Sequence, residues 1–290
     1  MMQTARSEIA GGTLLDERWL APGDAWEALL ALPDDGSPGD LLERVRLALG
    51  AAAVDVNLVG ADLATRRKRL LVADMDSTII GQECIDEMGD VLGIKARIAA
   101  VTERAMRGEL DFEGALKERL ALLAGLTTAD LQRVFDDRIT INPGARELVG
   151  TMRAHGGFAA LVSGGFTFFT SRVARAVGFD TDRANALLMD GGRLTGNVEE
   201  PILGREAKLA FLQEFAAGRG LHPALTLAVG DGVNDLAMIR AAGLGVAFRA
   251  KPVVAAEASA SITHGDLTAL LYLQGYSREE HVAAGARRDA

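Results

Sequence analysis

The chain has 290 residues, 49% of them hydrophobic, with a formal net charge of -9. This composition supplies enough apolar surface for a buried core and argues against a disordered chain. The acidic balance argues against broad attraction to nucleic acid or to an anionic membrane surface, so we expect neither as a partner.

Cysteine usage and the first residues bear on the compartment. Cys84 is the only cysteine, which excludes an intramolecular disulfide and fits a reducing environment. The opening MMQTARSEIAGG lacks the apolar stretch of a secretory signal. Charged or polar residues interrupt each apolar run before it reaches bilayer length. We therefore expect a cytoplasmic protein.

Residues 1–66 are predicted to form a small N-terminal α+β module. Helices are expected over residues 24–32 and 41–48, and the alternation from Val54 to Leu58 is typical of a strand. The segment carries no ligand motif, so three roles stay open: a degenerate regulatory domain, the surface of a homodimer, or packing alone. The basic run at residues 66–69 is interpreted as a solvated linker.

Residues 67–290 have the pattern of an α/β domain. Short apolar runs, typical of strands covered on both faces, occupy residues 70–73, 157–162, 225–229 and 243–248. Helical patterns separate them, which predicts a Rossmann-like parallel sheet. Residues 84–140 are helical throughout and too long for a simple crossover, so a helical cap inserted after strand one is expected. A glycine-rich turn predicts a β-hairpin over residues 186–198.

Small and acidic residues follow three of the predicted strands. The segments are Asp74-Met75-Asp76-Ser77-Thr78, Ser163-Gly164-Gly165 and Gly230-Asp231-Gly232-Val233-Asn234-Asp235. In an open α/β sheet, ligands bind beyond the carboxyl ends of the strands, so these segments are expected to converge. Asp74 and Asp76 lie two residues apart, and on a continuing strand they would share a face.

The residue types at this edge favour phosphoryl chemistry with a metal. Carboxylates crowded together need a neutralising cation, and their hard oxygens suit Mg²⁺. The four histidines of the chain lie away from these motifs, which argues against zinc. Glycine backbone N–H groups and Lys208 could hold phosphoryl oxygens, while a carboxylate could serve as nucleophile.

In order and placement, these motifs and Lys208 resemble those of the haloacid dehalogenase-like phosphatases, over residues 68–275. The resemblance implies that Asp74 is the nucleophile and Asp76 the general acid/base. It implies a Mg²⁺ site formed by Asp74, the main-chain carbonyl of Asp76, Asp231 and Asp235, the last perhaps through water. It assigns the phosphoryl oxygens and the nucleophile's surroundings to Ser163, Gly164, Lys208 and Asn234.

Within that superfamily, the cap segment resembles the phosphoserine phosphatase family. Glu83, nine residues after Asp74, matches the acid that meets the substrate ammonium, and Arg119 matches the base that pairs with its carboxylate. Phe112 and Met106 match residues of the substrate lining. The resemblance implies hydrolysis of O-phosphoserine through a phospho-aspartate, in serine biosynthesis.

Three other functions stay open at this point. The substrate could be another small phosphomonoester, such as phosphohomoserine. The phosphoryl group could pass to an alcohol instead of water, because a phospho-aspartate does not select its acceptor. A catalytically silent regulatory module is the third, and the intact set of Asp74, Asp76, Lys208 and Asp231 argues against it.

Overall fold

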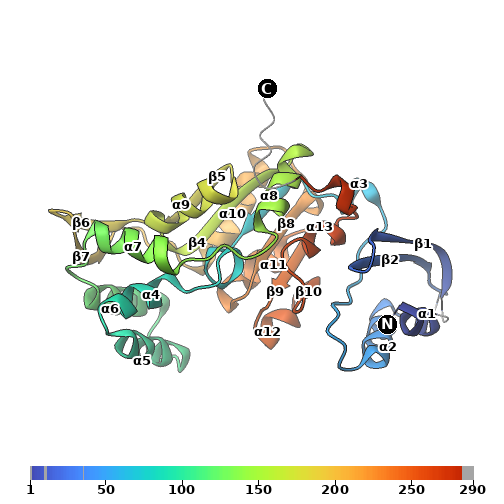
Figure 1. Ribbon diagram of the computed structural model, residues 1–290, viewed down its shortest axis with the longest axis horizontal. Helices are drawn as coiled ribbons and strands as arrows, with labels where there is room; N and C mark the ends of the chain where they lie inside the picture. Colours follow the sequence, from blue (N-terminus) through green and yellow to red (C-terminus); the bar gives the residue numbers. More distant parts are fainter. Residues whose placement is uncertain (1, 10–11, 35, 283–290) are drawn as a thin grey trace.

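A computed structural model describes residues 2–9, 12–34 and 36–282 of the chain. A parallel sheet of six strands forms its centre, in the order β10-β9-β8-β3-β4-β5 (Figure 1). The strands are β3 (Leu70–Ala73), β4 (Phe158–Phe166), β5 (Thr181–Asn185), β8 (Thr226–Gly230), β9 (Leu244–Phe248) and β10 (Ala260–Ile262). The Rossmann-like sheet predicted from the sequence is thereby confirmed, and β5 and β10 extend it beyond the predicted strands.

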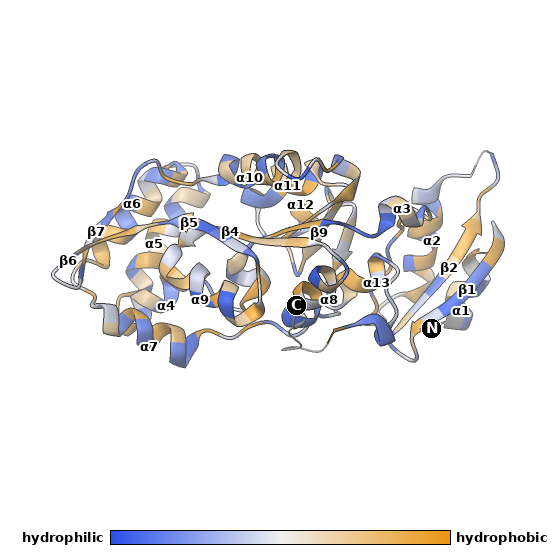
Figure 2. Ribbon diagram, turned by 90° about the horizontal axis from the view of Figure 1, so that it is seen from above, coloured by the Kyte–Doolittle hydropathy of each residue, from blue (hydrophilic) through white to orange (hydrophobic). Residues whose placement is uncertain are grey.

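The central strands are buried because helices cover both faces of the sheet. Alternate residues of β3 take part in different cores. Leu71 packs with α8 (Ala145–Ala154), α9 (Thr167–Val177) and α13 (Ala269–Leu273). Leu70 and Val72 pack on the other face with α10 (Arg205–Ala217) and α11 (Leu236–Ala241). Burial on both faces explains the uninterrupted apolar runs, which are visible in β4 and β9 in Figure 2. The short helix α12 (Pro252–Ala255) packs beside β9.

The helical insertion follows β3, as predicted. Its helices are α4 (Cys84–Val91), α5 (Lys95–Met106), α6 (Phe112–Leu122) and α7 (Thr128–Arg138). The predicted hairpin is also present, as β6 (Leu187–Asp190) and β7 (Arg193–Val198). It lies at the same end of the molecule as the cap (Figures 1 and 2).

The N-terminal segment lies at the opposite end of the molecule (Figure 1). Its elements are α1 (Met2–Glu8), β1 (Thr13–Ala21), β2 (Ala25–Ala31), α2 (Pro38–Leu49) and α3 (Leu63–Arg66). The predicted helix over residues 24–32 is wrong, because that segment is strand β2, paired antiparallel with β1. Trp26, Ala28 and Leu30 alternate toward the core formed with α1 and α2, which is the period of a strand.

Two further expectations for this region are wrong. Residues 54–58 form no strand and lie outside the sheets. The run at residues 66–69 is no solvated linker: the Lys68 ammonium is buried and donates to the carbonyls of Thr65 and Ala224, at 2.6 and 2.7 Å. Arg66 pairs with Glu27 of β2 at 2.5 Å.

Two side chains of the segment between α2 and α3 cover the β10 edge of the central sheet. Asn57 binds both backbone groups of Ser261 in β10, accepting from its N–H at 2.8 Å and donating to its carbonyl at 3.0 Å. Asp55 accepts from the N–H groups of Thr263 and Gly265, each at 2.8 Å. Exposed strand edges invite pairing with other chains, and these side chains occupy the edge instead.

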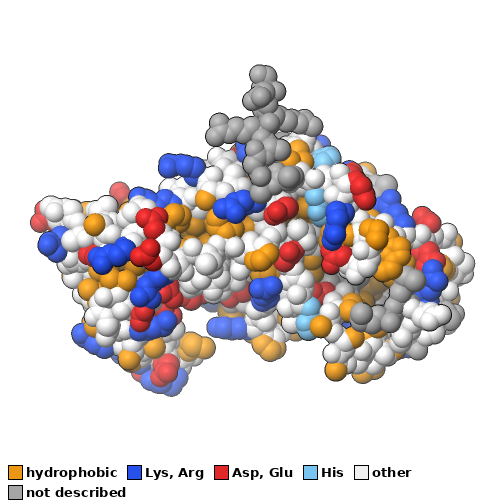
Figure 3. Space-filling view, in the orientation of Figure 1, with side chains coloured by type: hydrophobic (Ala, Val, Ile, Leu, Met, Phe, Trp, Pro, Cys, Tyr) orange, Lys and Arg blue, Asp and Glu red, His pale blue; other side chains and the backbone are white. Residues whose placement is uncertain are grey.

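Charge is mixed on the surface, and helix length bears on membranes. On the face in Figure 3, the described Lys and Arg side chains are interspersed with Asp and Glu. Within the described ranges, every helix is too short or too polar to cross a bilayer.

The contact of Asn57 with the sheet edge leads to a stability prediction. Asn57→Ala leaves the N–H and carbonyl of Ser261 without their partner, so the free energy of unfolding should fall by about 1–3 kcal/mol. Urea denaturation measures this difference. Asn197→Ala, at an exposed position of β7, is the control and should change stability by less than about 0.5 kcal/mol. Equal stability of both variants would contradict a role for Asn57 at the edge.

Candidate active site

The first aspartate of the site follows β3 directly. Asp74 is buried beyond Ala73, and its Oδ1 accepts from the N–H of Met75 at 2.8 Å. The same oxygen lies 2.7 Å from the ammonium of Lys208, which α10 delivers. Both contacts fall on one carboxylate oxygen and fix the orientation of the group.

A backbone kink, and not a continuing strand, brings Asp76 to the same site. The strand ends at Ala73, and Asp76 and Ser77 interrupt the helical turn over Met75–Ile79. Ser77 takes φ of 55°, a conformation that L side chains seldom adopt and that often marks a functional site. The Asp76 carboxylate accepts from the N–H of Cys84 at 3.0 Å and from the hydroxyl of Ser163 at 3.3 Å.

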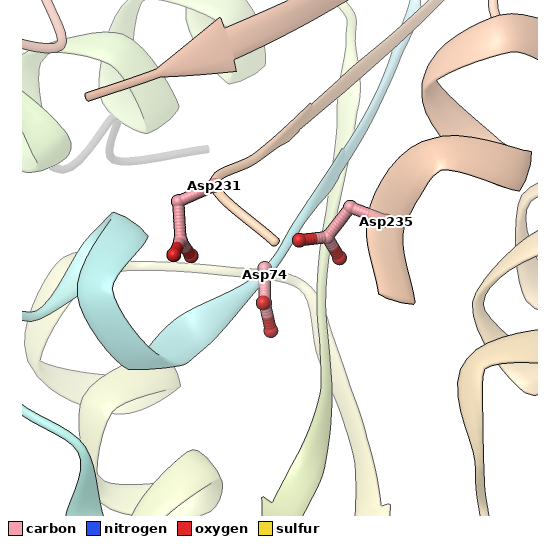
Figure 4. Close-up of side chains that lie close together, drawn as sticks. All are labelled: Asp74, Asp231 and Asp235. Carbon is pink, nitrogen blue, oxygen red and sulfur yellow. The ribbon is translucent and has the colours of Figure 1, made fainter. Parts of the chain in front are cut away.

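Three carboxylates converge at the carboxyl end of the sheet (Figure 4). Oxygens of Asp74, Asp231 and Asp235 all lie within 4.8 Å of one another. The hydroxyl of Thr78 donates to Asp231 at 3.1 Å, and the N–H of Gly232 donates to Asp235 at 3.0 Å.

Burial and mutual repulsion disfavour the ionised form of these groups. Burial first, and then the charge of Asp235, raise the pKa of Asp74 well above its usual range. The same two causes raise the pKa of Asp231 to about 6. A divalent cation would relieve this repulsion, and oxygen-only ligands suit Mg²⁺, so the residues present fit the expected metal.

Lys208 is the cation that the site itself provides. Its side chain is 2% exposed and lies 2.6 Å from Asp235, besides its contact with Asp74. Burial by itself would lower the pKa of Lys208, but the charges of Asp74 and Asp235 raise it above its usual value. Lys208 is therefore a permanently charged ammonium that neutralises one of the three carboxylates.

The glycines after Ser163 lie within a strand. The sequence predicted that strand two ends at this motif, but β4 continues to Phe166 and α9 begins at Thr167. The N–H of Gly165 donates to the Ser163 hydroxyl at 2.9 Å. A Cβ at Gly165 would lie 2.9 Å from Asp76 Oδ2, so a side chain there would displace the carboxylate.

Glu83, at the start of the cap, and Arg119 of α6 are close enough for their charges to act on each other. Glu83 accepts from the Ser77 hydroxyl at 2.7 Å, and desolvation followed by the charge of Asp76 raises its pKa to about 7. Arg119 is half-buried, and its Nε donates to the carbonyl of Ala115 at 3.2 Å. Burial lowers the pKa of Arg119, while the charges of Asp86 and Glu83 oppose that change.

The other predicted residues are placed less uniformly. Phe112 lies close to Gly164 in β4, because a Cβ at Gly164 would be 3.3 Å from the Phe112 ring. Asn234 is partly buried in the turn after β8, beside Gly232. Met106 is 72% exposed at the end of α5, and this position does not support its expected role in the substrate lining.

The sequence analysis did not single out three residues that lie at or near the site: Asn185, Cys84 and Asp86. Asn185 is buried at the end of β5 and donates to the carbonyl of Gly164 at 2.9 Å, which holds the glycine motif in place. No sequence signal marks Asn185. Cys84 and Asp86 could have been found, because they lie one and three residues after Glu83, at the start of a predicted helix.

Comparisons with known proteins identify the relatives of this chain. A sequence model of the haloacid dehalogenase-like hydrolases matches residues 71–240. The phosphoserine phosphatase of Albidiferax ferrireducens is 47% identical over 210 residues, which cover 71% of this chain and 89% of that protein. A solved HAD family hydrolase from Salmonella enterica subsp. enterica serovar Typhi has a TM-score of 0.84 at 30% identity, covering 94% of this chain and 92% of that one.

Another relative is considerably longer than this chain. The phosphoserine phosphatase of Streptomyces coelicolor is 45% identical over 248 residues, which cover 85% of this chain. The match spans 60% of the length of the Streptomyces protein. The similarity to that protein therefore concerns only part of it.

The position of Lys208 leads to a prediction about the site without metal. Lys208→Gln leaves Asp74 and Asp235 buried without their cation, so the free energy of unfolding in chelator should fall by about 3–5 kcal/mol. Mg²⁺ should restore part of this loss. Lys95→Gln, exposed at the start of α5, is the control for urea denaturation. If both variants are equally stable in chelator, the ion pair is not a stabilising contact.

Proposed function

This chain belongs to the haloacid dehalogenase-like hydrolase family, and we propose that it hydrolyses O-phosphoserine to serine and phosphate with the help of Mg²⁺. The observation that carries the proposal is the buried group of Asp74, Lys208, Asp231 and Asp235 at the end of the sheet. The relatives described as phosphoserine phosphatases support the choice of substrate.

In the first step, Asp74 acts as the nucleophile. One of its carboxylate oxygens attacks phosphorus, and the bond from phosphorus to the serine oxygen breaks. Lys208 holds Oδ1 at 2.7 Å, so the carboxylate needs little reorientation before attack. The product of this step is a phospho-aspartate, a form of covalent catalysis that divides hydrolysis into two easier displacements.

Asp76 serves both steps as the acid and the base. Burial raises the pKa of Asp76, which favours the protonated form needed to donate a proton to the departing serine oxygen. In the second step, the ionised Asp76 takes a proton from water, which attacks phosphorus and releases phosphate and the Asp74 carboxylate. Its contacts with Cys84 and Ser163 hold the group in place throughout.

The phosphoryl group needs positive charge and N–H donors around it. We assign its oxygens to Lys208, to Ser163, to the backbone of Gly164 and to Asn234. Mg²⁺ would neutralise the charge that accumulates on these oxygens. We assign it to Asp74, Asp231, the main-chain carbonyl of Asp76 and, through water, Asp235.

The cap supplies the contacts that select the substrate. Phosphoserine carries an ammonium and a carboxylate besides its phosphate, and each needs a partner when it leaves water. Glu83 suits the ammonium and Arg119 suits the carboxylate. The ring of Phe112 lies beside Gly164. Production of serine would place the chain in serine biosynthesis. The cytoplasmic location and the homodimer stay predictions.

The reaction is tested by phosphate release from a set of phosphomonoesters. With Mg²⁺, we expect phosphoserine to be turned over with a higher kcat/KM than phosphohomoserine or 4-nitrophenyl phosphate. After metal removal with chelator, release should fall to the level of Asp74→Asn, whose amide is a poor nucleophile.

Each other result in that assay has a definite meaning. Preference for another ester would replace the substrate, and inactivity on all esters would favour a regulatory module. Full turnover in chelator would refute the metal requirement. If an added alcohol receives the phosphoryl group in place of water, the protein is a phosphotransferase.

Substrate selection by the cap is tested at Arg119. Arg119→Ala should lower kcat/KM for phosphoserine, because the substrate carboxylate loses its buried partner. The loss should correspond to about 2–5 kcal/mol of transition-state stabilisation. The same variant should affect 4-nitrophenyl phosphate much less, since that ester has no carboxylate. Glu83→Gln should behave likewise through the ammonium, and Arg97→Ala, exposed on α5, is the control. Equal losses on both esters would show that these residues support the fold and not recognition.

A further inference from the structure

The hairpin formed by β6 and β7 takes no part in the mechanism, yet its backbone is bonded to the cap. The N–H of Gly125 donates to the carbonyl of Leu194 at 2.8 Å, and the N–H of Leu194 donates to the carbonyl of Leu126 at 2.8 Å. The N–H of Thr128 donates to the carbonyl of Gly192 at 3.1 Å. The hairpin is thereby bonded to the loop between α6 and α7.

Helix α6 approaches this hairpin most closely at one glycine. Gly196 has φ of 84°, and a Cβ there would lie 3.1 Å from the Cβ of Ala124 and 3.2 Å from the Cα of Ala121. It would also lie 3.3 Å from the carbonyl oxygen of Leu120. The last turn of α6 therefore lies directly on the backbone of β7, and an added Cβ would force one of the two to shift by a few tenths of an ångström.

The same helix carries two of the residues assigned to the substrate. Phe112 is the first residue of α6, and Arg119 lies in its last turn, next to Leu120. Leu120 and Leu194 are both buried in the core, so the helix cannot slide freely over the hairpin. A change of a few tenths of an ångström at Gly196 would thus be passed to the backbone that carries Arg119.

We propose that the β6–β7 hairpin positions α6, and that Gly196 is a positioning residue for the recognition of the substrate carboxylate by Arg119. This inference rests on the proposed function, since it deepens the account of how phosphoserine is selected. Gly196 touches no reacting atom and acts through the helix alone. Small misplacements of a substrate-binding group are costly, because affinity and rate depend on alignment.

The test compares two glycines of the hairpin that share a positive φ. Gly196→Ala introduces the close contacts, whereas Gly191→Ala, with φ of 53°, has nothing within 4 Å of the added Cβ. In Gly196→Ala, KM for phosphoserine should rise about tenfold or more with kcat changed less. Turnover of 4-nitrophenyl phosphate should stay within about twofold of the unchanged protein, because no carboxylate is recognised there. Gly191→Ala should leave the turnover of both esters unaffected.

A rescue variant and a second site make the test decisive. Ala124→Gly in the Gly196→Ala background removes the nearest contact, at 3.1 Å. The KM for phosphoserine should then fall part of the way back to that of the unchanged protein. If Gly196→Ala does not fold, Arg193→Ala decides, because it removes only the hydrogen bond to the carbonyl of Gly125, at 3.0 Å. A selective rise in KM for phosphoserine in that variant supports the inference, and an unchanged KM overturns it.

Other outcomes separate this inference from the proposed function. Equal losses of Gly196→Ala on both esters, in folded protein, would mean that the hairpin supports the fold alone and would overturn the positioning role. Unchanged kinetics would overturn it as well. The unaltered protein supplies the independent check: if it releases phosphate from 4-nitrophenyl phosphate and not from phosphoserine, the proposed substrate fails, and the inference fails with it.

Discussion

The buried ammonium of Lys208 between Asp74 and Asp235 is the contact on which the rest of the site depends. Three carboxylates and one ammonium leave a net of two negative charges when all are ionised, in a region largely removed from water. Such a group is stable only with a further cation or with retained protons. The raised pKa values of Asp74 and Asp231 express the same constraint, which a divalent cation would relieve.

The strand order explains how distant segments supply that group. β3 lies between β4 and β8, so Asp74 after β3, Ser163 in the last half of β4 and Asp231 after β8 meet at one end of the parallel sheet. Helix α10 packs on the face formed by alternate residues of those strands, and this contact delivers Lys208. The apolar burial of the sheet therefore supplies the energy that holds like charges together, because the charges alone would separate.

The parts that could be predicted from sequence are those whose pattern is local. Continuous apolar runs marked the buried strands, and the aspartate motifs marked the strand ends. The segment over residues 24–32 was misjudged because its Ala, Leu and Glu residues favour a helix locally, whereas pairing with β1 and packing on α1 decide for a strand. Asn57 and Asn185 were invisible for the same reason, since their partners Ser261 and Gly164 lie far away in the chain.

This division between local and distant information also separates chemistry from specificity. The aspartates that we propose as nucleophile and metal ligands occur in compact motifs at strand ends. Arg119 is placed differently: its helix packs on a hairpin that follows much later in the chain, at a glycine whose backbone conformation and close neighbours disfavour a side chain. Recognition of the substrate carboxylate can therefore change through packing far from the aspartates, while the phosphoryl chemistry stays intact.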